Sequence, residues 1–368
     1  MLWVVCGVIG CAQPDAEHPI VEMGMQLVST APPIALDDGA SPILAEPVGA
    51  IELEDGRILI ADGSDRDIKI YSPSGTRIGV LGRKGPGPNE FMSLTGIALI
   101  NKTIVALDNQ QFRFNRFDAN DLAPLSAVRL EGFKGMPMTV SSASDSELLV
   151  SRFALGEHRG DLIAIVDADG TVRGGVLNER DYFEDDPWLI QRVTPKATVS
   201  SDLVFAASGG GDPVVSIYTG TTRARLAKVR YQVVDESGSH DVPSARTLRG
   251  KMTSDEVRNL PEDNPIDRRR FLSTLTGLPD SAVVMVFRRF DAPRGVDWMA
   301  PANAAVIRWC RDGWRLSNAA PIPGMVVGTG HQGELLVLSY ADDSRDRYRL
   351  HRLSPQFAGG APCDAAPS

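Results

Sequence analysis

The sequence predicts an all-β protein: a six-bladed β-propeller with four-stranded antiparallel blades, closed by its N-terminal strand. Short apolar runs alternate with turn residues along the chain, which has 35 Gly and 25 Pro among 368 residues, a composition typical of many strands joined by turns. A two-strand unit recurs six times. Repeats of roughly 40 to 50 residues with short strands are typical of propeller blades.

The second strand of each unit is a short apolar run, and the third strand is an alternating run that follows it. The second strands begin at residues 58, 104, 148, 203, 283 and 335, and the third strands at 68, 114, 163, 215, 305 and 348. Turn pairs that tolerate positive φ, namely Asp55-Gly56, Asp169-Gly170 and Asp312-Gly313, separate alternating segments. Six strand pairs predict six blades.

The two ends of the chain are expected to complete the last blade together. The sixth unit lacks a fourth strand, and the alternating stretch 20–28 has no unit of its own. We predict that residues 20–28 pair with the strand around Tyr348 to Leu353, followed by a loop that begins near residue 30. The propeller then spans residues 20–356 and leaves a flexible tail at 357–368, without an open seam.

The first unit also resembles a known family of repeats. The segment IADGSDRDIKIYSPSG and the glycine-rich link VLGRKGPGPNEF that follows it are similar to the NHL repeat over about residues 48 to 118. Asp67 stands before Ile68 where the family usually has an Asn-Arg pair, and the motif fades in later units. The resemblance implies an NHL-like six-bladed propeller of the secreted bacterial type. The matching residues are Ala61, Asp62, Ile68, Tyr71, Gly82, Gly85, Gly87, Phe91, Gly96 and Ile97.

The N-terminal residues predict export. Residues 1–10 are apolar and read as a signal peptide, and Val8 to Cys11 resembles the lipobox of bacterial lipoproteins, which implies lipidation at Cys11 and a linker at 11–19. The alternatives are a plain secretory signal cleaved elsewhere, or a buried strand. The resemblance implies a bacterial cell envelope protein, anchored in the outer membrane and facing the periplasm or the surface; without the anchor it would be secreted.

Cysteine usage leaves two alternatives for the mature chain. If Cys6 leaves with the signal peptide and Cys11 carries lipid, only Cys310 and Cys363 remain of the four cysteines. In an oxidising compartment this pair can form a disulfide that ties the tail to the last blades. Two free thiols fit the sequence equally well.

Three long connections are expected on one end of the ring, where they would form a binding face. They span about residues 178–196, 231–279 and 288–304. The middle one contains a capping box, Thr253 to Glu256, that predicts a short helix, which is either a lid over the axial mouth or a surface decoration that binds no ligand. Loop aromatics beside charges suit recognition of a protein, peptide or small molecule, or they anchor the loops to the propeller. The candidate residues are Trp188, Arg268, Arg269, Phe271, Arg288, Trp298 and Tyr340.

The sequence contains no local catalytic motif. Its net charge of -9 disfavours a nucleic-acid footprint, and its five histidines are scattered without ligand spacing. Asp62 and Asp108 follow the second strands of adjacent blades and could bind Ca²⁺ through oxygen, or they cap turns through backbone amides. The predicted function is therefore a monomeric exported binding module without a cofactor. The alternative is a metal-assisted, calcium-type propeller hydrolase or lactonase.

Overall fold

A computed structural model describes residues 18–39, 44–153, 160–178, 195–207, 214–219, 225–230, 270–289, 298–341 and 347–358, together with Cys363. The predicted signal peptide, Cys11 and most of the predicted linker lie outside the described residues, as does the predicted capping box. Within the described part, no helix is long and apolar enough to cross a membrane.

The first three blades are separate four-stranded antiparallel sheets with their strands in sequence order. Blade 1 contains β2 (Pro47–Glu52), β3 (Ile58–Asp62), β4 (Asp67–Tyr71) and β5 (Arg77–Leu81). Blade 2 contains β6 (Leu94–Ile100), β7 (Thr103–Asp108), β8 (Arg113–Asp118) and β9 (Pro124–Arg129). Blade 3 contains β10 (Met136–Ser142), β11 (Glu147–Phe153), β12 (Asp161–Asp167) and β13 (Val172–Asn178).

The remaining blades include a separate sheet and a nine-stranded one. Blade 4 contains β14 (Lys196–Ser200), β15 (Leu203–Ala207), β16 (Val214–Thr219) and β17 (Arg225–Arg230). Blade 5 contains β18 (Arg270–Leu278), β19 (Ala282–Arg289), β20 (Ala302–Cys310) and β21 (Gly313–Ser317), and the short β22 (Ala320–Ile322) pairs with β20. Blade 6 contains β23 (Met325–Thr329), β24 (Leu335–Tyr340) and β25 (Tyr348–Ala358), completed by β1 (Ile20–Ala35).

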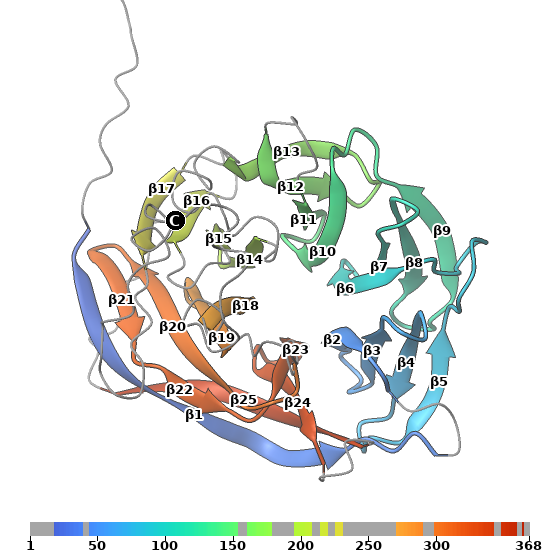
Figure 1. The fold of residues 1–368 in the computed structure, drawn as a ribbon, viewed down its shortest axis with the longest axis horizontal. Helices are drawn as coiled ribbons and strands as arrows, with labels where there is room; N and C mark the ends of the chain where they lie inside the picture. Colours follow the sequence, from blue (N-terminus) through green and yellow to red (C-terminus); the bar gives the residue numbers. More distant parts are fainter. Residues whose placement is uncertain are drawn as a thin grey trace, which may run out of the picture.

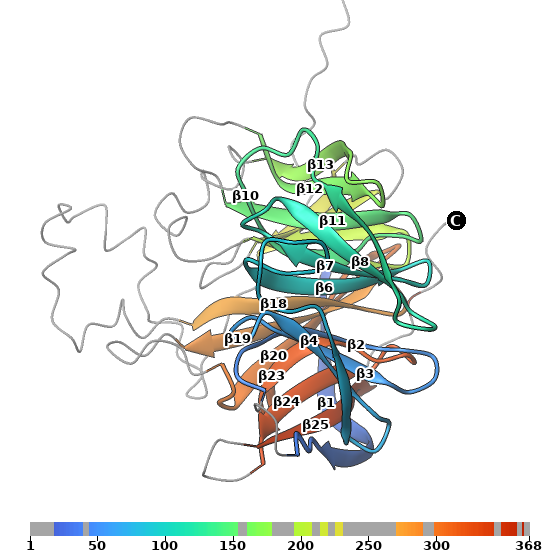
Figure 2. The ribbon, with the colours of Figure 1, turned by 90° about the vertical axis from the view of Figure 1, so that its right-hand side faces the viewer.

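The blades form a ring around a central axis, with the first strand of each blade innermost (Figure 1). In the side view, the sheets of successive blades lie against one another (Figure 2). Six buried apolar clusters hold the ring together, and each draws most of its side chains from two neighbouring blades. Both faces of a middle strand are therefore covered: all five residues of β3 are buried, which is why such strands read as continuous apolar runs.

Glycines let the inner strands and links come close together. A Cβ on Gly277 of β18 would lie 2.0 Å from the carbonyl oxygen of Val199 in β14, and one on Gly328 of β23 would lie 2.0 Å from the carbonyl oxygen of Ala50 in β2. In the glycine-rich link, Gly82 has a φ of +72° and packs against the Phe91 ring. These glycines therefore serve the backbone geometry of the ring.

The N-terminal strand closes the ring as predicted, but it is longer and pairs in a different register. Residues Ile20–Met23 run parallel to β21 of blade 5, and Gly24–Ala35 run antiparallel to β25 of blade 6. The expected partner of residues 20–28, Tyr348 to Leu353, pairs instead with the later residues of β1. The segment near residue 30 is thus strand rather than loop, because register shifts between Ser29 and Ile34 accommodate its two prolines at the edge of the sheet.

Two further boundaries differ from the sequence prediction. The predicted insertion 231–279 ends earlier, because β18 is the inner strand of blade 5. A register shift between Leu272 and Thr274 interrupts its two-residue alternation and so hides the strand from a pattern search. The predicted tail 357–368 begins later, since Phe357 pairs with Met25 and packs on the apolar cluster between blades 5 and 6.

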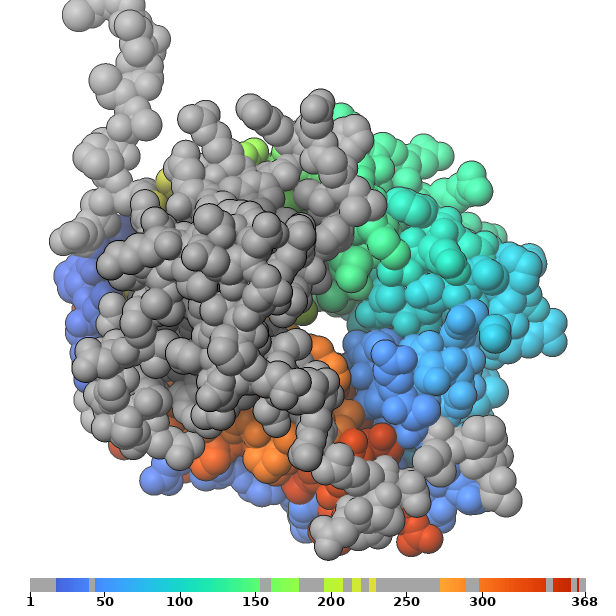
Figure 3. Space-filling model, viewed as in Figure 1, coloured from blue at the N-terminus to red at the C-terminus, as the bar shows by residue number. Residues whose placement is uncertain are grey.

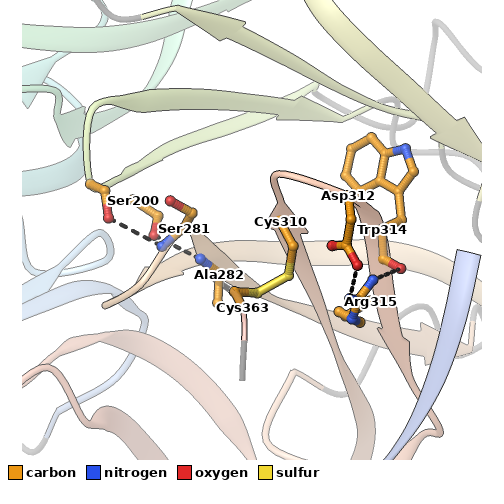
Figure 4. Close-up of a disulfide and its surroundings, with 9 residues drawn as sticks. Ser200, Ser281, Ala282, Cys310, Asp312, Trp314, Arg315 and Cys363 are labelled. Atoms are coloured by element: carbon orange, nitrogen blue, oxygen red, sulfur yellow. Dashed lines mark hydrogen bonds and ion pairs between the residues drawn. A yellow bond between two sulfur atoms is a disulfide. The ribbon is translucent and has the colours of Figure 1, made fainter. Parts of the chain in front are cut away.

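A disulfide crosses the same pair of blades that β1 joins. Cys310, at the end of β20, is bonded to Cys363, which follows β25, with their Cα atoms 5.2 Å apart (Figure 4). The nearby hairpin is fixed by Arg315, which donates to the carboxylate of Asp312 at 2.6 Å (Figure 4). Of the two alternatives for the cysteines, the structure therefore contains the disulfide.

Candidate functional site

The inner strands of the six blades enclose an axial cavity of about 1370 Å³. Space-filling atoms leave an opening at the centre of the ring, bordered by the blue and orange segments (Figure 3). Each blade contributes to the wall, for example through Ala50, Ala98, Val140, Thr198, Leu275 and Val327. The cavity follows from the fold itself, since the inner edge of every blade faces the axis.

The strand directions divide the ring into two ends. Each inner strand pairs antiparallel with the second strand of its blade, so all inner strands begin where all second strands end. The strands that flank segments 179–194, 231–269 and 290–297 also have their connected ends there. We call this the long-connection end; the three segments themselves lie outside the described residues.

The predicted binding residues that the structure describes lie at the long-connection end. Trp298 precedes β20 and is 45% exposed, and Tyr340 ends β24 with its ring centroid 5.6 Å from that of Tyr348. All three aromatic residues line the cavity. Phe271 is near the start of β18, at the same end. Trp188, Arg268 and Arg269 lie outside the described residues.

Arg288 has a different environment from the one predicted for a binding residue. Its side chain is 5% exposed, and its guanidinium donates to the carbonyl oxygens of Ala300 at 2.8 Å and Gly324 at 2.7 Å. It therefore ties blade 5 to the link that leads into β23. Arg152 at the end of β11 is similar: it is buried and donates to the carbonyl oxygens of Lys134 and Asp161. These arginines stabilise connections between strands.

Asp62 is buried in a network of backbone and side-chain donors. Its carboxylate accepts hydrogen bonds from the N–H groups of Ala45 at 2.7 Å and Glu46 at 3.1 Å, which precede β2, and from two N–H groups of its own turn. Lys69 adds an ion pair at 2.7 Å. Burial alone would raise the pKa of Asp62, but the Ala45 N–H and the Lys69 ammonium outweigh it and hold this pKa below its ordinary value.

Asp108 repeats this arrangement in blade 2. Its carboxylate accepts from the N–H groups of Met92 at 2.8 Å and Ser93 at 3.2 Å before β6, and from Gln111 at 3.2 Å in its own turn. The geometry thus matches the turn-capping alternative.

The Asp62 and Asp108 pair does not fit the proposed Ca²⁺ site. The Lys69 ammonium already occupies the cation position beside Asp62, and backbone N–H groups take up the oxygens of both carboxylates. Calcium needs six to eight oxygen ligands. Among the described residues, no three His, Cys, Asp or Glu side chains group to hold a metal ion. We therefore derive no metal-assisted step from these residues.

Lys196 is a cavity residue that the sequence did not reveal. It is the first residue of β14 and lines the axial cavity at the long-connection end. Burial lowers the pKa of its ammonium to about 8. The only signal in the sequence is a lysine at the start of the inner strand of blade 4, and a lysine at a strand end is usually solvated.

Comparisons with known proteins agree with this architecture. Residues 40–147 match the model of the DUF5128 family, described as a 6-bladed beta-propeller. A Bacteroides fragilis protein predicted to be exported has 12% identity and a TM-score of 0.58, covering 92% of this chain and 100% of that one. A DUF4221 family member from Bacteroides vulgatus has 10% identity and a TM-score of 0.56, covering 91% and 99%. No curated protein matches the chain significantly.

The chain is thus a six-bladed β-propeller similar in fold to these two bacterial proteins. At these identities the similarity concerns the fold alone. The NHL motif and the lipobox remain resemblances of the sequence.

Proposed function

We propose that this protein is an exported binding module that takes a ligand into its axial cavity from the long-connection end. The observation that carries the proposal is the cavity of about 1370 Å³ with an exposed tryptophan, Trp298, and a tyrosine pair, Tyr340 and Tyr348, in its lining. Aromatic side chains provide contact area at little cost in conformational entropy. Because the surrounding blades pack on both neighbours, the wall is rigid and the site is largely preformed.

Two observations support an extracytoplasmic location. The Cys310 to Cys363 disulfide joins the last two blades, and disulfides persist in oxidising compartments. A bacterial protein of similar fold is predicted to be exported. The apolar residues before Cys11 agree with export, and we extend the proposal to lipid anchoring at this cysteine.

The binding proposal is tested by soaking crystals with a panel of neutral, anionic and cationic fragments. We expect electron density for bound fragments inside the axial cavity, and we expect Trp298→Ala to weaken their binding in solution by about tenfold, roughly 1.4 kcal/mol. Phe112→Ala is the matched control, because Phe112 is 40% exposed and is not part of the cavity wall. Fragments bound only on the outer surface would contradict the proposal.

Lipid anchoring has its own test. The protein expressed with residues 1–10 in place should partition with membranes, and Cys11→Ser should release it, since lipidation requires the Cys11 sulfur. Labelling with a radioactive fatty acid gives a second readout. Equal partitioning of the two forms would show that Cys11 is not an anchor and would favour the secreted alternative.

A further inference from the structure

Lys196 lies in an unusual electrostatic position. Within the described residues, no hydrogen bond or ion pair joins its ammonium to another group, and burial is the cause of its lowered pKa. About nine-tenths of such a lysine is still protonated one pH unit below its pKa, that is, near pH 7. The wall of the cavity therefore carries a positive charge that no carboxylate of the described residues neutralises.

The carboxylates that line the cavity lie away from Lys196. Glu52 is at the opposite end of its inner strand and pairs with Arg352 at 2.7 Å, and Glu54 follows it in the β2 to β3 turn. Glu46 precedes β2, which faces β14 across the ring (Figure 1). None of the three therefore compensates the charge of Lys196.

A second lysine, in blade 1, shows how this protein compensates the positive charge of a buried ammonium. Lys69 is fully buried, whereas Lys196 is partly exposed, and the Lys69 ammonium contacts three carboxylates, those of Asp62, Asp65 and Asp67, at 2.7, 2.7 and 3.1 Å. Despite its burial, these contacts raise the pKa of Lys69. The fully buried lysine of blade 1 thus has three carboxylate partners, whereas Lys196 has none among the described residues and lines the axial cavity.

The wall near Lys196 offers hydrogen bonds and apolar contacts as well. Thr198, two residues along β14, accepts a hydrogen bond from Gly277 of β18 at 2.9 Å, so the two inner strands lie side by side. Thr274 of β18 and Met138 of β10 line the cavity from the neighbouring blades. A ligand held by Lys196 would therefore meet hydroxyl and apolar groups on either side.

We propose that the axial cavity binds an organic carboxylate, with the Lys196 ammonium paired to the carboxylate group and the aromatic and methionine side chains covering its apolar part. The proposal rests on the proposed function, because it needs the cavity to be the binding site. It goes further by naming the ligand class and the residue that selects it. A charge-assisted hydrogen bond in a partly dehydrated site gives selectivity over a neutral analogue of the same shape.

The test compares benzoate with benzamide, which have nearly the same shape, by ligand-observed NMR against four proteins. We expect wild type to prefer benzoate, and Lys196→Gln to weaken benzoate binding by about tenfold or more while leaving benzamide unchanged. Lys196→Arg should retain most of the preference. Lys228→Gln is the matched control, since it removes the same charge from the exposed face of β17 in the same blade.

The outcomes separate this inference from the proposed function. If benzamide binds in the cavity as well as benzoate does, or if Lys196→Gln has no effect on benzoate, the ligand class is wrong and the binding site stands. If neither compound nor any fragment enters the cavity, the proposed function fails too.

Stability gives an independent readout. Because a desolvated cation with no partner among the described residues disfavours folding, Lys196→Met should raise the unfolding temperature. A lower unfolding temperature would show that Lys196 supports the structure, and it would overturn the proposal.

Discussion

Blades 1 and 2 carry the same aspartate at the same place and surround it differently. Asp62 ends β3 and Asp108 ends β7, and each accepts hydrogen bonds from the backbone just before the inner strand of its blade. Seven residues after Asp62, blade 1 has Lys69, and at the equivalent place in β8 blade 2 has Asn115. Both side chains are fully buried, yet one is charged and the other is neutral.

The consequence for the two blades is different. In blade 1 the Lys69 ammonium contacts three carboxylates, so the polar cluster satisfies itself. In blade 2 a group of buried polar atoms around Asp108 has no hydrogen-bond partner within the described residues. A buried water, which both donates and accepts, suits such a mixture. The unpartnered atoms are Asn109 Oδ1, Gln111 Nε2, Arg113 Nε and Asn115 Oδ1.

This difference shows which part of the arrangement the fold requires. The carboxylate that accepts backbone N–H groups is common to both blades, while the third-strand residue changes from a lysine that contacts this carboxylate to an asparagine that donates to the Glu90 carbonyl oxygen. The aspartate therefore belongs to the blade geometry, because it fixes the link before the inner strand. The third-strand partner decides how strongly each cluster is stabilised.

The largest expected effect is that of removing the ammonium. Lys69→Met leaves Asp62 buried without its counter-charge, and we expect the free energy of unfolding to fall by about 3–5 kcal/mol. Asn115→Leu is the matched change in blade 2; it removes one hydrogen bond to the Glu90 carbonyl oxygen, at 2.9 Å, and should cost about 1 kcal/mol. Urea unfolding at pH 7 measures both. Equal losses would mean that the two clusters are equivalent after all.

A smaller contrast is expected between the two aspartates. Asp62→Asn should lower the free energy of unfolding by about 2–3 kcal/mol. The substitution removes the negative charge that accepts hydrogen bonds from the backbone N–H groups and from the Lys69 ammonium. Asp108→Asn should cost about 1–2 kcal/mol, since only backbone N–H donors are affected. Chemical denaturation of the two variants in parallel gives the comparison. A greater loss for Asp108→Asn would show that backbone capping outweighs the ion pair.

The strands of both blades were predictable from the sequence for a physical reason. Blades pack on two neighbours, so middle strands such as β3 and β7 are buried on both faces and appear as short apolar runs. The inner strand β18 was missed because a register shift breaks its alternation between Leu272 and Thr274. The full length of β1 was missed because Pro32 and Pro33 indicate a loop, although an outer strand with bulges accommodates them.

The candidate site was less predictable than the fold. The cavity wall combines residues from six strands that are far apart in the chain, so the position of Lys196 follows only from ring closure. Arg288 shows the opposite problem, because a polar residue at the end of a second strand looks available for binding in the sequence and is buried against two carbonyl oxygens in the structure. Burial of this kind depends on the neighbouring blade.

The smallest expected effect concerns pH and again distinguishes the two blades. The pKa of Asp62 is lower in the folded protein than its ordinary value of 3.8, so its ionised form stabilises the fold fully above that value. This stabilisation is lost as the pH falls below 3.8 through the lowered folded pKa. Asp67 acts in the opposite sense, because burial raises its pKa, and the wild-type curve alone therefore does not isolate Asp62.

The difference in unfolding free energy between wild type and Asp62→Asn reports on Asp62, together with the part of the raised Asp67 pKa that the Asp62 charge causes. We expect this difference to stay constant between pH 7 and 5 and to shrink steadily as the pH falls below 3.8. For Asn115→Leu the difference from wild type should stay flat over the same range, because no ionisable group is removed from blade 2. Urea titrations at closely spaced pH values measure both differences. If the Asp62→Asn difference stays unchanged down to pH 3, the blade 1 carboxylate keeps its charge there, and its ion pair with Lys69 is stronger than we infer.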